Sequence, residues 1–125
     1  MIYLDTHVAA WLYASGAADL SPRATELMDG SDDIRASPMV RLELQYLYEI
    51  GRVGEPAAVV VDALTATLGL TLCPASFVSV AHEAEQLTWT RDPFDRLIVA
   101  QAALHDARLV TKDETMRANY PRAVW

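Results

Sequence analysis

Residues 91–103 read RDPFDRLIVAQAA and predict a buried helix with charged groups at its start. Asp92 can cap this helix, Pro93 suits its first position, and Asp95 places a carboxylate where the helix dipole favours it. The residues that follow are almost wholly apolar, as in a helix buried on most sides. Because two acids spaced in this way are also a common helix start, the positions of the other acids decide whether Asp95 has a chemical role.

Short apolar strands alternate with longer helices throughout the chain. We expect strands at residues 2–4, 34–36, 70–73 and 109–111, and helices at residues 8–14, 22–28, 38–50, 56–69, 77–87, 93–105 and 114–119. Residues 121–125 are expected to form a tail. The alternation predicts an α/β fold with a central parallel sheet and helices on both faces. No linker or repeat interrupts it, so we expect residues 1–125 to form one domain.

Composition narrows the class of protein. Hydrophobic residues make up 52% of the chain and charged residues 22%, which is typical of a globular domain. No apolar run approaches the ~20 residues that span a bilayer, and the first residues lack the basic region of a signal peptide. The single cysteine, Cys73, lies in an apolar run and cannot form an intrachain disulfide, which fits a small core residue. We therefore expect a cytoplasmic protein without a membrane partner.

The charge is negative and unevenly distributed. Residues 1–90 hold 4 basic and 12 acidic side chains, residues 91–125 hold 6 basic and 5 acidic ones, and the net charge is -7. Such a balance argues against binding nucleic acid through the overall field of the protein. An acidic cluster that takes up cations would also make a chain acidic while it still acts on phosphates.

Four acids are expected at one edge of the predicted sheet. Asp5 and Asp113 each follow a predicted strand, and the active sites of such sheets lie beyond the carboxyl ends of the strands. Glu43 and Asp95 lie in the first halves of two predicted helices. Carboxylates brought together raise one another's pKa unless a hard cation such as Mg²⁺ or Mn²⁺ compensates their charge. His7 either packs, caps a helix or donates to a ligand, and the histidines do not have the spacing of a zinc site.

Four segments resemble PIN-domain nucleases, most closely the VapC-type toxins of toxin–antitoxin pairs. They are IYLDTH at residues 2–7, SPMVRLE at residues 37–43, RDPFDRLIVAQA at residues 91–102 and LVTKD at residues 109–113. The resemblance spans nearly the whole chain and implies a PIN fold and a metal-dependent endoribonuclease. It also implies the residues that catalyse and that bind Mg²⁺, or Mn²⁺ in its place: Asp5, Glu43, Asp95 and Asp113. Leu42 stands where many relatives carry tryptophan.

Other residues near the acids are expected to support them. Thr6 and Thr111 are candidate supporting hydroxyls, and Asp92 either caps the helix only or also assists through water. The basic residues that border the acids either hold RNA phosphates or form structural ion pairs: Arg91, Arg96 and Lys112.

The resemblance further implies two protein contacts. One is a homodimer, and the other is an antitoxin whose disordered tail lies across the toxin. The candidate contact residues, most of which a core position would also explain, are Trp11, Leu12, Tyr46 and Tyr48.

The sequence leaves two alternative functions open. A strand that ends in Asp-Thr also occurs in phosphatases and receivers with an aspartate nucleophile. Those proteins need a second aspartate two residues later, where this chain has His7. The other alternative is an interaction domain that keeps the PIN fold without catalysis, against which the four acids argue.

Overall fold

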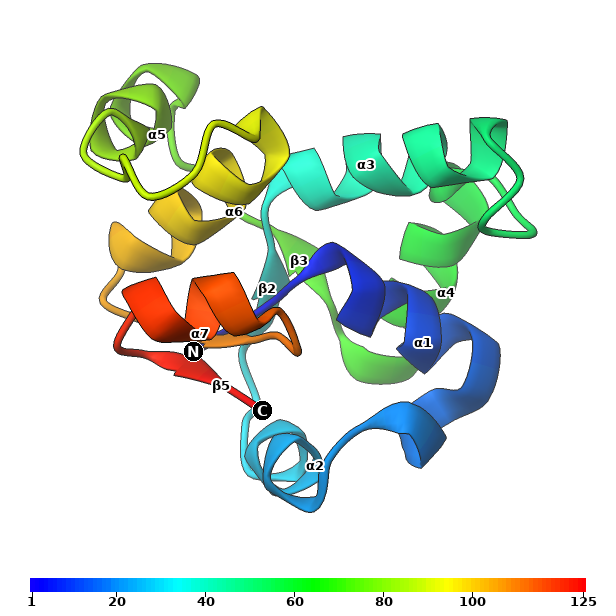
Figure 1. Ribbon diagram of the computed structural model, residues 1–125. Helices are drawn as coiled ribbons and strands as arrows, with labels where there is room; N and C mark the ends of the chain where they lie inside the picture. Colours follow the sequence, from blue (N-terminus) through cyan, green and yellow to red (C-terminus); the bar gives the residue numbers. More distant parts are fainter.

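Five parallel strands form the centre of the fold, in the order β3-β2-β1-β4-β5 (Figure 1). The computed structural model describes all 125 residues. The strands are β1 (Ile2–Leu4), β2 (Ile34–Ala36), β3 (Thr71–Leu72), β4 (Arg108–Val110) and β5 (Ala123–Val124). Leu4 of β1 pairs with Ala36 on one side and with Val110 on the other. The three longest strands therefore end level with one another at the same edge.

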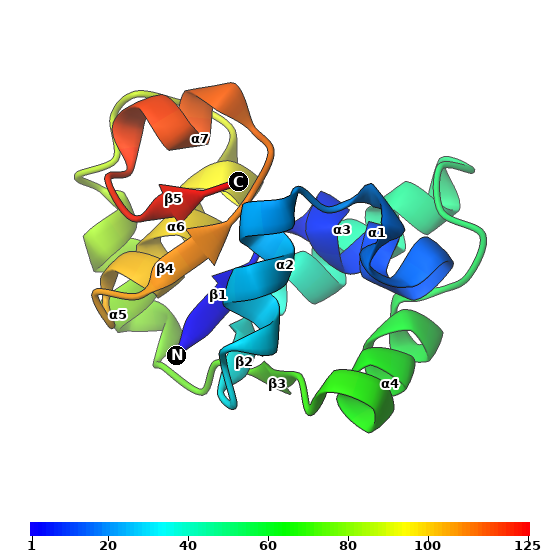
Figure 2. The same cartoon turned by 90° about the horizontal axis from the view of Figure 1, so that it is seen from below.

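Seven α-helices and one short 3-10 helix connect the strands. They are α1 (Thr6–Ser15), η1 (Gly16–Asp19), α2 (Pro22–Asp29), α3 (Pro38–Glu49), α4 (Ala57–Leu68), α5 (Phe77–Ala84), α6 (Pro93–Ala103) and α7 (Glu114–Asn119). In both views α1 and α4 lie on one side of the strands and α5 and α6 on the other (Figures 1 and 2). This arrangement confirms the predicted α/β fold. No helix combines the length and the apolar character needed to cross a bilayer.

The core surrounds β1, whose three residues are all buried. Leu4 and Val8 lie among fully buried side chains of α3, α6 and β4, including Leu44, Ile98 and Leu109. A strand covered on both faces reads as a continuous apolar run, which is why residues 2–4 could be recognised in the sequence. The buried Cys73 has the core position predicted for it.

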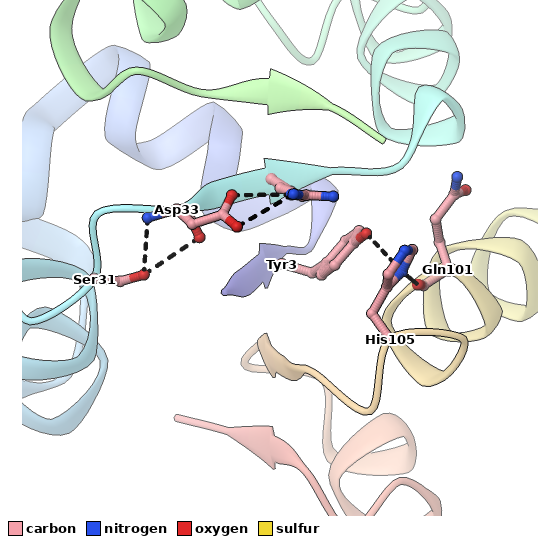
Figure 3. Close-up of polar contacts among 6 residues, drawn as sticks. Tyr3, Ser31, Asp33, Gln101 and His105 are labelled. Atoms are coloured by element: carbon pink, nitrogen blue, oxygen red, sulfur yellow. Dashed lines mark hydrogen bonds and ion pairs between the residues drawn. The ribbon is translucent and has the colours of Figure 1, made fainter. Parts of the chain in front are cut away.

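A polar contact between Tyr3 of β1 and His105 anchors the C-terminal end of α6 (Figure 3). The hydroxyl of Tyr3 lies 3.0 Å from His105 Nδ1, which is also 3.2 Å from the carbonyl oxygen of Gln101. Burial raises the pKa of the Tyr3 phenol above its ordinary value. His105, just after the last turn of α6, therefore partners a buried phenol, which the sequence did not indicate.

The structure differs from the sequence prediction mainly at the ends of elements. Residues 121–125 were predicted as a tail, but Ala123 and Val124 form β5 beside β4. The amide of Thr111 donates to the carbonyl oxygen of Val124, at 3.0 Å. Helix α5 ends at Ala84, before the predicted Leu87. It ends there because the carbonyl groups of its last residues accept hydrogen bonds from the guanidinium of Arg96 and from the backbone amides of a tight turn.

Candidate active site

Asp5 is fixed at the carboxyl end of β1 by its neighbours. Its amide donates to the carbonyl oxygen of Val110 at 3.0 Å, which continues the ladder between β1 and β4. One carboxylate oxygen, Oδ1, accepts from the amide of Thr6 at 2.7 Å, and the other, Oδ2, accepts from the hydroxyl of Thr111 at 2.7 Å. Only 6% of Asp5 is exposed. Its carboxylate is therefore held in one orientation, with a lone pair on each oxygen still free.

The hydroxyl of Thr111 links the two acids that follow β1 and β4. It donates to Asp5 and accepts from the amide of Asp113 at 3.0 Å. Oδ1 of Asp113 in turn accepts from the amide of Met116 at 2.8 Å and caps α7. Both acids are thus placed by the ends of adjacent strands, as the sheet topology predicts.

The first turn of α6 supplies two more acids, which have different environments. Oδ1 of Asp92 accepts from the amides of Phe94 and Asp95, at 2.8 and 3.2 Å, and so caps the helix. The side chain of Asp95 is half-buried and accepts no hydrogen bond from the protein. The cap and the chemically free carboxylate are therefore separate residues.

One cavity of about 390 Å³ brings the predicted acids together. Glu43 enters it from α3, Asp95 from α6, and Asp5 and Asp113 from the strand ends. Its lining is Asp5, His7, Trp11, Glu43, Asp92, Asp95, Lys112 and Asp113. The buried Thr6 and Thr111 lie behind Asp5.

Of the three predicted basic residues, Lys112 alone lines this cavity. Arg96 donates to the carbonyl oxygens of Ala84, at 3.0 and 3.2 Å, and of Glu85, at 3.3 Å. Arg91 donates to the carbonyl oxygen of Thr88 at 2.7 Å. Both arginines therefore brace the loop between α5 and α6 in this structure.

The acids crowd one another electrostatically. The pKa of Asp95 is raised to about 7, first by burial and then by repulsion from Asp92, Asp5, Asp113 and Glu43. Burial also raises the pKa of Asp5, although the hydrogen bonds from Thr111 and Thr6 oppose the rise. The pKa of Glu43 is raised in the same way, first by burial and then by the charge of Asp5.

The donor set has the chemistry of a hard-cation site. The available ligands are carboxylate oxygens, which Mg²⁺ and Mn²⁺ prefer. The hydroxyl oxygen of Thr6 is buried beside Asp5 and has no hydrogen-bond partner within the protein. No three acidic, histidine or cysteine side chains lie close enough in the structure to hold an ion as they stand. The donor atoms fit such an ion by their chemical type, and binding it would require the carboxylates to lie closer together than they do in this structure.

Comparison with known proteins identifies the family of this chain. The family model described as PIN domain matches residues 2–120. This chain belongs to the PIN domain family. Ribonuclease VapC22 of Mycobacterium tuberculosis is 34% identical to this PIN domain over 132 residues, which cover 98% of the chain and 95% of that protein. The resemblance seen in the four sequence segments is therefore confirmed.

A solved structure shows the same PIN fold at lower sequence identity. It is the crystal structure of VapBC2 from Rickettsia felis bound to a DNA fragment from their promoter. It matches with a TM-score of 0.65 and 22% identity, and the match covers 100% of this chain and 98% of that chain.

The aromatic residues of this PIN domain were not all placed correctly by the sequence. A core position was favoured for most of them, yet Tyr46 and Tyr48 of α3 are 50% and 40% exposed. Trp11 and Leu12 are partly buried and pack against the core. Sequence reasoning also missed Trp125, whose ring centroid lies 5.7 Å from that of Trp11. Its position depends on the unpredicted strand β5, so no local signal could have revealed it.

Proposed function

We propose that this chain is a metal-dependent endoribonuclease that hydrolyses RNA phosphodiester bonds and acts as the toxin of a toxin–antitoxin pair. The observation that carries the proposal is the cavity in which Asp5, Glu43, Asp95 and Asp113 meet at the carboxyl edge of the sheet. Membership of the PIN domain family supports it, as does the 34% identity to a protein named as a ribonuclease.

The acids would divide the work of holding Mg²⁺, or Mn²⁺ in its place. Asp5 and Asp95 are the principal ligands that we propose, with Glu43 and Asp113 completing the set. The ion, when bound, supplies an activated water and stabilises the negative charge on the leaving oxygen. Asp5 is suited to its role because Thr111 and the amide of Thr6 fix its orientation.

The remaining groups of the cavity act on the substrate or on the fold. Lys112 offers an ammonium group to a phosphate beside the acids. Asp92 holds the first turn of α6, and its second oxygen accepts no hydrogen bond from the protein, which leaves it able to bind water in the cavity.

Cleavage of RNA by the purified chain tests this proposal. We expect internal cuts in the presence of Mg²⁺ or Mn²⁺, none in excess chelator, and none with Asp5→Asn or Asp95→Asn. Asp62→Asn, which changes an exposed acid of α4 outside the cavity, is the matched control and should cleave normally. The proposal fails if the unmodified chain does not cleave RNA with either ion, or if Asp95→Asn cleaves at the normal rate.

The same experiments separate the two alternatives. An aspartate nucleophile would leave a phosphoryl group on Asp5, which is detectable by mass, and membership of the PIN domain family argues against it. An inactive interaction domain would have no use for the acids, so calorimetric titration with Mg²⁺ would show no binding that depends on Asp95.

The protein partners that we propose are a second copy of the chain and an antitoxin in the cytoplasm. The acidic residues 1–90 suit a basic antitoxin tail. Light scattering should give the mass of a dimer, and co-expression with the neighbouring open reading frame should yield a complex that no longer cleaves RNA. A monomer, or a free and active enzyme in that co-expression, would contradict these assignments.

A further inference from the structure

The cavity has two chemically different kinds of lining residue. Five of its lining residues are acids, and the other three are His7, Trp11 and Lys112. His7 and Trp11 are four residues apart on α1 and therefore share a face of the helix, with ring centroids 6.2 Å apart. The nuclease chemistry proposed above uses the acids and leaves the aromatic rings without a role.

The residues around Trp11 come from distant parts of the chain. Trp125 follows β5 and meets Trp11 edge-on, with the ring centroids 5.7 Å apart and an angle of 61° between the planes. Lys112 follows β4, and its Nζ lies 5.8 Å from the centroid of Trp11 and 5.9 Å from that of Trp125. Two indoles and one ammonium group thus converge beside Asp113.

The ring of Trp11 is accessible although the residue is partly buried. It lines the acid cavity and also an adjacent cavity of about 430 Å³, to which Tyr13 and Arg52 contribute. A ligand that enters from either cavity can reach the indole. Trp11 is the one tryptophan that lines these two cavities, because neither Trp125 nor Trp89 contributes to their lining.

We propose that Trp11, supported edge-on by Trp125, forms a platform on which an unpaired base of the RNA substrate stacks, next to the bond that the acids cleave. This inference rests on the proposed function and assigns Trp11 as the residue that contacts the base beside the cleaved bond, which must be unpaired there. Every base has a face that can stack on an indole, whereas the bases of a duplex are already stacked on one another. Lys112, held over both rings, contacts the phosphate next to the stacked base.

A purely structural role is the competing explanation. Lys112 and Trp125 could simply fasten the end of the chain to α1 through cation–aromatic contacts. Such a fastening explains the contacts of Lys112 with the rings. It does not explain why Trp11 and Lys112 line the same cavity as the acids, and it predicts no dependence of RNA binding on the indoles.

Tryptophan fluorescence tests the platform without requiring cleavage. The parent protein carries Asp5→Asn to prevent cleavage and Trp89→Phe to remove the unrelated signal. Titration with a short single-stranded oligoribonucleotide should quench the emission of Trp11 and Trp125. The same RNA as a duplex, or an abasic strand with the same phosphates, should bind at least about tenfold more weakly.

Substitutions of the indole distinguish stacking from folding. Trp11→Leu should weaken single-strand binding by about tenfold or more, while Trp11→Phe, which keeps an aromatic face, should retain most of it. Circular dichroism and a melting curve check that both variants fold, and Trp125→Leu provides a second test at the other ring. Equal affinity in the parent and in both leucine variants, or equal affinity for the abasic strand, would refute the platform.

The failure of this inference can be told apart from the failure of the proposed function. If the unmodified chain cleaves RNA and Trp11→Leu does so with unchanged KM for single-stranded substrate, the platform is refuted and the nuclease stands. If base-dependent binding is found but the unmodified chain cleaves no RNA with Mg²⁺ or Mn²⁺, the nuclease is refuted and the platform stands.

Discussion

Asp95→Asn tests whether the acids of the cavity repel one another, because the amide keeps the shape of the side chain and removes its charge. The Asp95 carboxylate accepts no hydrogen bond from the protein, and the helix cap is Asp92. The substitution therefore removes the cost of burying the charge and the repulsion from the other acids. As the one opposing effect, it also removes the favourable interaction of Asp95 with the dipole of α6.

The pKa of Asp95 sets the sign and the size of the effect. Burial and the neighbouring acids raise it from 3.8 to about 7. Below pH 3.8 the carboxyl is protonated in the folded and the unfolded chain, so it costs nothing. Between pH 3.8 and about 7 only the unfolded chain loses the proton, so the free energy of unfolding falls as the pH rises, and above pH 7 the penalty is complete.

At about 1.4 kcal/mol for each pH unit, the full penalty is about 4 kcal/mol. Solvent screening reduces it because the side chain is only half-buried. Loss of the dipole interaction offsets a further ~0.3–1 kcal/mol. We therefore expect Asp95→Asn to raise the free energy of unfolding by about 1 kcal/mol at pH 8 in chelator, and to have little effect near pH 4.

Urea denaturation at pH 4 and pH 8, with and without Mg²⁺, checks this expectation. With Mg²⁺ at about 100 times its Kd, binding should add about 2.7 kcal/mol to the unmodified chain, so the order of stability should reverse. Asp62→Asn, at an exposed position on α4, controls for the change in net charge. The argument from crowding is wrong if Asp95→Asn is less stable than the unmodified chain at pH 8 in chelator. It is also wrong if Asp62→Asn raises the free energy of unfolding as much as Asp95→Asn does.

The other predictions concern the neighbours of the acids. Thr111→Val should lower the free energy of unfolding by about 2 kcal/mol and abolish cleavage, because it removes the hydroxyl shared by Asp5 and Asp113, whereas Thr111→Ser should behave normally in both assays. Asp92→Ala should cost about 1 kcal/mol of stability and Asp92→Asn almost none; a loss of cleavage in the folded asparagine variant would show that Asp92 does more than cap α6. Lys112→Gln should weaken RNA binding and reduce the slope of log K against log salt by about 0.7, and Arg91→Gln should do so less, because Arg91 donates to a loop carbonyl instead of lining the cavity. Equal slopes for these two variants would place the phosphate path elsewhere.

The sequence was informative wherever one residue determines its own surroundings. Asp92 and Pro93 mark the start of α6, and the apolar run of β1 marks a strand buried on both faces. The edge rule for parallel sheets then placed Asp5 and Asp113 at one end of the sheet. These signals are local or follow from topology, so the fold and the meeting of the four acids could be predicted.

The sequence was uninformative where contacts between distant segments decide the outcome. Strand β5 has two residues, and its pairing with β4 is its main support. Arg96 was expected near RNA because it is next to Asp95, but a residue one position along a helix faces a different direction, and its guanidinium reaches the end of α5 instead. Tyr46 was one of four residues for most of which a core position was expected, yet α3 turns it toward solvent and toward Phe94.

The division of the cavity also resolves an apparent conflict in the charge of the protein. A chain of net charge -7 repels a polyanion at long range, so its overall field cannot hold RNA. Stacking on an indole carries no such penalty, because it acts on the base and not on the phosphate. A single ammonium group held by two rings adds attraction at one phosphate only, beside Asp113. The acids can then concentrate negative charge for a cation, while Trp11 and Lys112 recognise the RNA strand.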